Sequence, residues 1–223
     1  MRSSAATLLI RVAGASYVAG ASPGGFIQAR GAILMVVLAT WAPDDAVLAA
    51  VAPLALALAA GTALVVDLDP GGPAYPGAGS LAALVRDGPR RVDLAPPRRG
   101  VAVLANGGIG AGEAAEVVAA LVAGWPAVVL RLPAGEPVTS HPVVPVRVLA
   151  PAIVASRPGG PAVYQQGPWR MALPGPGVLL PRPRPGAVRA LLTGDRPPAG
   201  RWLRAWRQVW ERPWRPVEEP AWA

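Results

Sequence analysis

The stretch from Thr62 to Pro73, which reads TALVVDLDPGGP, constrains the fold of this chain more than any other segment. Its apolar part, Ala63–Val66, is β-branched at its end and too short for a helix, so we expect a buried strand there. Asp67 and Asp69 follow directly and stand two residues apart. Because side chains alternate across a strand, both carboxylates should lie on the same side of the strand end.

The residues after this pair predict a sharp turn. Pro70 cannot donate to a strand ladder, and Gly71 and Gly72 permit backbone conformations that other residues avoid. A strand that ends in this way is typical of the ligand-binding edge of an open α/β sheet. Two solvated acids at the start of a turn would produce the same pattern. Asp67 and Asp69 are therefore either binding residues or solvated acids without a binding role.

Short apolar runs and helical patterns alternate through the chain. This alternation predicts an α/β fold, with a doubly wound and mostly parallel sheet flanked by helices. Asp44 or Asp45 is placed to cap the first helix, and Ser80 the second. Strands are predicted at residues 33–39, 63–66, 92–94, 100–106, 127–132, 146–150, 162–166 and 178–180, and helices at residues 45–60, 81–86, 113–123, 185–192 and 200–212.

Composition divides the chain into three parts. We expect a loosely attached extension at residues 1–30, an α/β domain at 31–195 and a basic, Trp-rich tail at 196–223. The net charge of +8 comes mostly from residues 151–223, which carry 11 arginines and 4 acidic residues. Such a region can meet an acidic partner or an anionic membrane surface. The chain has no cysteine, which excludes disulfides and thiolate metal sites and fits a cytoplasmic protein.

A phosphate-binding loop is missing from the place where this fold would carry one. Such a loop needs glycines whose amides cradle phosphate, together with a lysine and a Ser or Thr. Residues 40–53 read TWAPDDAVLAAVAP, with no glycine and no lysine. Asp44 and Asp45 stand where an anion would bind, and they would repel it.

Five segments of the chain resemble the ParA/MinD-type P-loop ATPases, especially the divergent CpaE/TadZ-like, septum-site-determining branch. The resemblance implies a P-loop NTPase-like fold over roughly residues 32–195. It also implies that Asp67, Asp69, Gly71 and Gly72 correspond to the strand end and turn of that family's nucleotide site. The segments that carry the match are Leu54–Gly72, Ser80–Leu84, Gly100–Ala105, Trp125–Pro133, and Pro181–Pro183 with Ala187–Leu192.

Two departures from the family pattern lead us to expect that nucleotide hydrolysis is lost. The phosphate loop is absent, and Arg131 stands where the family carries an aspartate on the magnesium side. An arginine cannot ligate Mg²⁺. We therefore expect a non-catalytic scaffold or positioning protein in a pilus, secretion or septum assembly, with a vestigial site, no bound ATP and no metal. Its partners would be proteins of that assembly, with a homodimer as a further option.

Other candidate sites in the sequence are weaker. The run 107–112, GGIGAG, precedes a predicted helix and could cradle phosphate in an active nucleotide-binding enzyme, although it lacks a lysine and such turns usually have only a structural role. His141 has no second histidine or cysteine as a zinc partner. Glu113 and Glu116 are typical of a solvated helix face rather than an acid/base pair.

The predicted C-terminal helix carries a stripe of tryptophans at intervals of four residues, which places Trp202, Trp206 and Trp210 on one face. Together with Arg204 and Arg207, this stripe could dock on a protein partner or a membrane interface. Glu211 is one of several acids that dilute the basic charge and argue against nucleic acid. The alternative is that the tryptophans pack the helix onto an aromatic-poor domain.

A membrane protein is the rival interpretation of the whole chain. Residues 46–66 contain no charge over 21 positions, which is long enough to span a bilayer. Pro53 and Gly61 interrupt this stretch, and nearly half of it is alanine, which drives insertion weakly. We therefore expect a buried helix followed by a strand.

Overall fold

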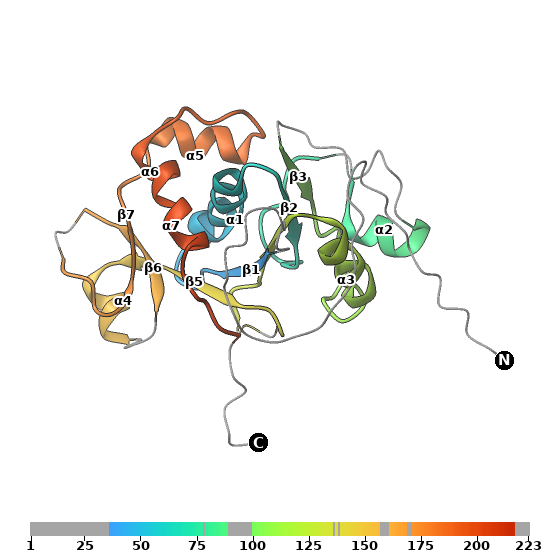
Figure 1. The fold of residues 1–223 in the computed structure, drawn as a ribbon, viewed down its shortest axis with the longest axis horizontal. Coiled ribbons are helices and arrows are strands. Elements are labelled where there is room, and N and C mark those ends of the chain that lie inside the picture. Colours follow the sequence, from blue (N-terminus) through green and yellow to red (C-terminus); the bar gives the residue numbers. More distant parts are fainter. Residues whose placement is uncertain are drawn as a thin grey trace, which may run out of the picture.

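The computed structural model describes residues 36–77, 79–88, 100–135, 137, 139–156, 161–168 and 171–216. Within them, seven parallel strands form one sheet in the order β3–β2–β4–β1–β5–β6–β7 (Figure 1). The α/β fold with a parallel sheet is confirmed. The strands are β1 Val36–Trp41, β2 Ala63–Asp67, β3 Val101–Leu104, β4 Ala127–Arg131, β5 Val143–Leu149, β6 Ala162–Gln166 and β7 Gly177–Leu180.

Helices cover both faces of the sheet, as in doubly wound folds. Helices α1, α5, α6 and α7 share one hydrophobic cluster with one face, whereas α2 and α3 share a second cluster with the other face (Figure 1). The helices are α1 Ala46–Ala60, α2 Leu81–Asp87, α3 Ala115–Gly124, α4 Pro151–Ser156, α5 Pro185–Leu192, α6 Arg201–Ala205 and α7 Arg207–Trp210.

Helix α1 and strand β2 begin and end within one residue of the predicted positions, whereas β1 continues two residues beyond its predicted end, to Trp41. The side chain of Asp45 accepts a hydrogen bond from the backbone N–H of Leu48 at 2.8 Å and so caps α1. Gly61 ends the helix at a positive φ of 90°, which an L side chain rarely adopts. Every residue of β2 is buried, as expected for a strand covered on both faces.

The membrane-spanning alternative needs residues 46–66 to form one continuous helix, and they do not. The helix ends at Ala60, and residues 63–67 pair with β3 and β4 inside the sheet. Gly61 and Thr62 make the turn between them. Across the part of the chain that the structure describes, no helix has the length and apolarity needed to cross a bilayer.

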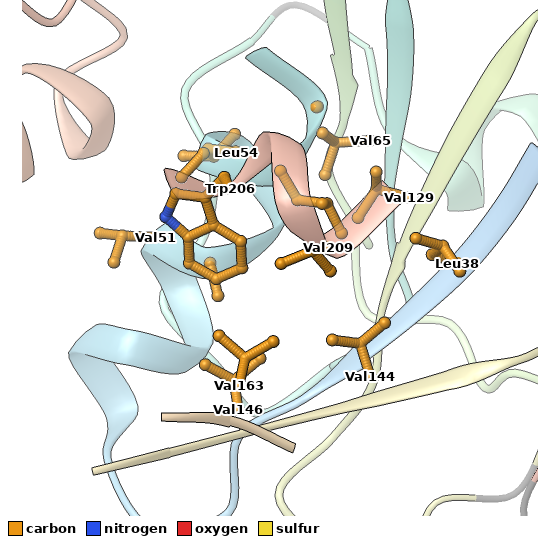
Figure 2. Packing of buried hydrophobic residues seen from close by; sticks show 14 of the residues in the cluster. Leu38, Val51, Leu54, Val65, Val129, Val144, Val146, Val163, Trp206 and Val209 are labelled. Carbon is orange, nitrogen blue, oxygen red and sulfur yellow. The ribbon is translucent and has the colours of Figure 1, made fainter. Parts of the chain in front are cut away.

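The C-terminal helices complete the core on the α1 face. Trp206 has no exposed surface, and its indole ring lies between Val51 and Leu54 of α1 and the sheet residues Val146 and Val163 (Figure 2). The region predicted as a separate tail from residue 196 therefore contributes to the domain interior as far as it is described. Its end also joins the sheet, because the Val143 N–H donates to the carbonyl of Arg215.

Several elements differ from the sequence-based predictions. The single helix predicted at 200–212 is interrupted at Trp206, where α6 ends and α7 begins. Strand β5 begins three residues earlier than predicted, because the strand includes Pro145. Pro145 pairs with Trp41, the last residue of β1. Helix α4, six residues long with Pro151 at its first position, was not predicted. The extension at 1–30 and the strand at 92–94 lie outside the described residues.

Candidate functional site

The carboxyl ends of β2 and β4 bring three predicted residues together. The two strands are neighbours, and their register places Asp67 opposite Arg131. Both side chains point to the face covered by α1, since alternate residues of each strand, Val65 and Val129, belong to the core cluster on that face. The loop that follows β2 brings Asp69 back over the same position.

The guanidinium of Arg131 bridges the two carboxylates. Its Nη1 donates to Asp67 Oδ2 at 3.3 Å and to the carbonyl of Pro73 at 2.8 Å, and its Nη2 donates to Asp69 Oδ2 at 3.0 Å. The Arg131 and Asp67 side chains are only 1% and 2% exposed, and that of Asp69 is 13% exposed. The acids that the resemblance assigns to a nucleotide site therefore face an internal cation.

Two further residues enclose this ion pair. The aromatic ring of Tyr75 lies 5.1 Å from the Arg131 Cζ atom, in reach of a cation–π interaction, and its hydroxyl donates to the carbonyl of Ala50 in α1. Gly72 lies so close that a Cβ atom there would overlap Arg131 Nη2. Gly72 thus packs against the arginine that fills the site, whereas the sequence assigned it to a turn and the resemblance to a vestigial nucleotide site.

Burial dominates the electrostatics of Asp67. Loss of solvation raises its pKa to about 6, and the nearby charge of Arg131 offsets only part of this effect. Burial also raises the pKa of Tyr75, so its hydroxyl stays protonated and can donate to Ala50. Arg131 Nε is buried and has no hydrogen-bond partner among the described residues, which adds to the cost of placing this cation inside.

The amino end of α1, where a phosphate would bind in a phosphate-loop protein, is occupied by the chain itself. Asp45 caps the helix through the Leu48 amide, so a carboxylate already interacts with the positive end of the helix dipole. Asp44 forms an ion pair with Arg147 of β5 at 3.4 Å, with both side chains mostly buried. Both acids of this loop are thus committed to the fold.

The glycine-rich run 107–112 is also held by the chain. Asn106, at the end of β3, accepts hydrogen bonds from the N–H groups of Gly108 and Ile109, both at 2.8 Å. Its amide nitrogen donates to the carbonyls of Asp67 and Ile109. Two amides that could have cradled a phosphate therefore bind a side chain, which favours the structural interpretation of this turn.

The remaining candidates do not join the Arg131 site. Glu113 and Glu116 are exposed at the start of α3. His141 lies in the loop before β5, beside a groove of about 390 Å³ against α3, and burial lowers its pKa. No set of three or more His, Cys, Asp and Glu side chains is placed to hold a metal ion within the described ranges.

The tryptophan stripe predicted as a docking face packs inside the chain instead. Trp202 and Trp206 are buried, and the half-buried Trp210 donates its indole N–H to the carbonyl of Leu56 in α1 at 2.9 Å. Of the five residues proposed for docking, only Arg204 and Arg207 are exposed. The alternative that the tryptophans fill an aromatic-poor core describes the structure, so these indoles are not a free binding face.

Tyr75 and Asn106 were missed by sequence reasoning. Asn106 is the last residue of the strand predicted at 100–106, and Tyr75 lies in the loop after the strand predicted at 63–66; their positions beside strand ends were the available signal. Arg131 was noticed only as a missing aspartate, because its role as a counter-ion depends on the pairing of β2 with β4. The chain matches no protein-family model and no curated protein.

Proposed function

We propose that this protein is a non-catalytic, ParA/MinD-like scaffold that positions components of a membrane-proximal assembly, such as a pilus or secretion apparatus or a division septum. It would act in the cytoplasm, with protein partners at or near the membrane. The parallel, doubly wound sheet supports this proposal, since it is compatible with a P-loop NTPase-like fold.

The position of Arg131 is the observation that carries the proposal. A hydrolytic relative needs strand-end acids that are open to a cation and its phosphates. Here the guanidinium of Arg131 binds both Asp67 and Asp69 at 3.3 and 3.0 Å, and the whole group is nearly buried. Binding Mg²⁺ there would require the chain to expel its own cation and to expose a carboxylate with a raised pKa.

The occupied loops support the same conclusion. The amino end of α1 is neutralised by Asp45, and the amides of the glycine-rich turn are held by Asn106. An intact fold whose site is filled by its own side chains is what we expect of a protein that kept a scaffold and lost its chemistry.

Calorimetry and a phosphate-release assay with ATP test the loss of nucleotide chemistry. We expect no Mg²⁺-dependent heat of binding and no hydrolysis above the buffer rate. Mg²⁺-dependent ATP binding that is abolished in Asp67→Asn would contradict the proposal, because it would show that the strand-end acid still serves a nucleotide.

The scaffold role is tested in the cell. A fluorescent fusion of the full chain should form discrete foci at the envelope, at a pole or at midcell. A uniform cytoplasmic distribution through the cell cycle would contradict a positioning function, whatever the outcome with ATP.

A further inference from the structure

A groove of about 230 Å³ opens at the carboxyl ends of β6 and β7, in the half of the sheet remote from Asp67. Its walls are Gln166 at the end of β6, the segment 181–187 that joins β7 to α5, and the segment 198–203 that begins α6. Figure 1 shows these elements side by side at one end of the molecule. The carboxyl ends of parallel strands are where open α/β sheets bind ligands.

Three arginines from two separate segments line this groove. Arg182 and Arg184 follow β7, and Arg201 begins α6. All three are exposed, and no ion pair joins any of them to an acid within the described ranges. Residues 171–216 contain nine arginines and two acids, Asp195 and Glu211, and neither acid lines the groove. The groove therefore carries a concentrated and uncompensated positive charge.

The start of α5 adds to this positive field. The helix is eight residues long, and no side chain caps its first turn at Arg184. Pro185 has no N–H and the Ala187 N–H donates to the carbonyl of Arg184, so the helix dipole is what favours an anion here. The dipole acts on the same space that the arginines surround.

One wall of the groove is apolar and held in place. Trp202 and Leu203 contribute to it, and Trp202 donates its indole N–H to Gln165 at 2.7 Å. The amide of Gln165 donates in turn to the carbonyl of Pro181 at 3.0 Å. This chain of hydrogen bonds fixes the end of β7 against α6, so the groove is formed before a ligand arrives.

We propose that this groove binds the phosphate monoester of a small molecule. A phosphate monoester carries a charge of about −1.5 to −2 and three acceptor oxygens, which match several arginine forks better than a single carboxylate does. The organic part of the ligand would lie against Leu203 and the small edge of the otherwise buried Trp202 that lines the groove. The volume of the groove suits a small ligand rather than a polymer.

This proposal is independent of the scaffold function. The groove lies beyond β1 and β5 from the Arg131 site and shares no lining residue with it. Binding here needs no Mg²⁺, whereas a surviving nucleotide site would need it. A failure of one proposal is therefore distinguishable from a failure of the other.

The test measures the binding of phenyl phosphate and of inorganic phosphate to the full chain, by calorimetry and by NMR shifts of the tryptophan indole N–H signals. We expect Mg²⁺-independent binding that weakens with salt, and a shift of the Trp202 signal with phenyl phosphate. The triple variant Arg182→Gln/Arg184→Gln/Arg201→Gln should lose detectable binding. The single variant Arg184→Gln should bind about tenfold more weakly.

A charge-matched control separates a site from general attraction. Arg189, Arg207 and Arg215 are exposed, and none of them lines the groove. The triple variant Arg189→Gln/Arg207→Gln/Arg215→Gln should keep wild-type affinity. Equal loss in both triple variants would overturn the proposal, because net charge alone would then explain binding.

Two other outcomes would also overturn it. One is the absence of binding by the wild-type chain to either probe at low salt. The other is binding to phosphatidylglycerol vesicles that persists in the presence of phenyl phosphate but is lost in the variant Arg182→Gln/Arg184→Gln/Arg201→Gln. That result would assign the arginines to a lipid surface. Should the groove triple fail to fold, the single variant and the wild-type NMR shifts decide the question.

Discussion

Replacement of Arg131 by methionine should destabilise this protein strongly, and more at pH 8 than at pH 5. Methionine keeps much of the apolar stem of the arginine and removes the guanidinium. Asp67 then loses its contact at 3.3 Å and Asp69 its contact at 3.0 Å. The side chain of Asp67 is 2% exposed, so solvent cannot replace the lost cation.

The size of the effect follows from this burial. Removing one partner of a buried ion pair costs about 3–5 kcal/mol, because an uncompensated charge stays inside. The whole domain is expected to have a stability of about 5–15 kcal/mol. Arg131→Met should therefore remove a large share of the free energy of unfolding at pH 8.

The pH dependence has a definite sign. Burial raises the pKa of Asp67 from 3.8 to about 6, so the folded state binds its proton more tightly than the unfolded state. In the wild type this proton contributes about 3 kcal/mol of stability. The contribution is fully present below pH 3.8 and is lost as pH rises through about 6. Arg131 lowers this pKa, so its removal raises the pKa further, and the variant can relieve its penalty by protonating Asp67.

Urea unfolding followed by tryptophan fluorescence at pH 5 and pH 8 measures both effects. The double variant Asp67→Asn/Arg131→Met should be more stable at pH 8 than Arg131→Met alone, since no buried charge remains at position 67. Arg86→Met, which breaks the exposed pair with Asp87, should leave the midpoint unchanged. A penalty for Arg131→Met that is below about 1 kcal/mol at pH 8, or equal at both pH values, would refute the buried-pair argument.

Two further predictions concern packing. Gly72→Ala should lower the thermal unfolding midpoint clearly, because a Cβ atom there would overlap Arg131 Nη2. Gly71→Ala should not lower it, because the nearest atom to a Cβ at Gly71 is 3.8 Å away. Similar thermal midpoints for the two variants would be inconsistent with this geometry. Trp202→Phe should destabilise the protein more than Trp206→Phe, since Trp202 donates to Gln165 whereas the buried Trp206 Nε1 has no partner among the described residues. The reverse order in urea titrations would show that the packing lost around Trp206 outweighs the hydrogen bond lost at Trp202.

The strands and long helices were predictable from local pattern. The apolar run before Asp67 is too short for a helix and ends in turn residues, and it forms β2. Helix α1 follows its cap at Asp45 and ends at Gly61, as those residue types predict. The break at Trp206 was not predictable in this way, because its spacing continues a helical stripe and the interruption occurs where that indole is buried against α1 and the sheet.

The candidate site was only half predictable. Sequence placed Asp67 and Asp69 at a strand end and identified Arg131 as a departure from a family pattern. It did not show that these residues meet, because Asp67 and Arg131 lie 64 positions apart in the chain. Likewise, the arginines after β7 and at the start of α6 form a groove only when α5 and α6 pack beside each other.

The sequence by itself determined the architecture, because strand length, helix caps and turn glycines act over a few residues. The tertiary structure alone decided which charges neutralise one another and which tryptophans are hidden. Those outcomes depend on strand order and on helix packing across the sheet, which bring distant residues within a few ångströms. Here they pair Asp67 and Asp69 with Arg131 inside the domain. The exposed arginines of the groove lie at the other end of the sheet.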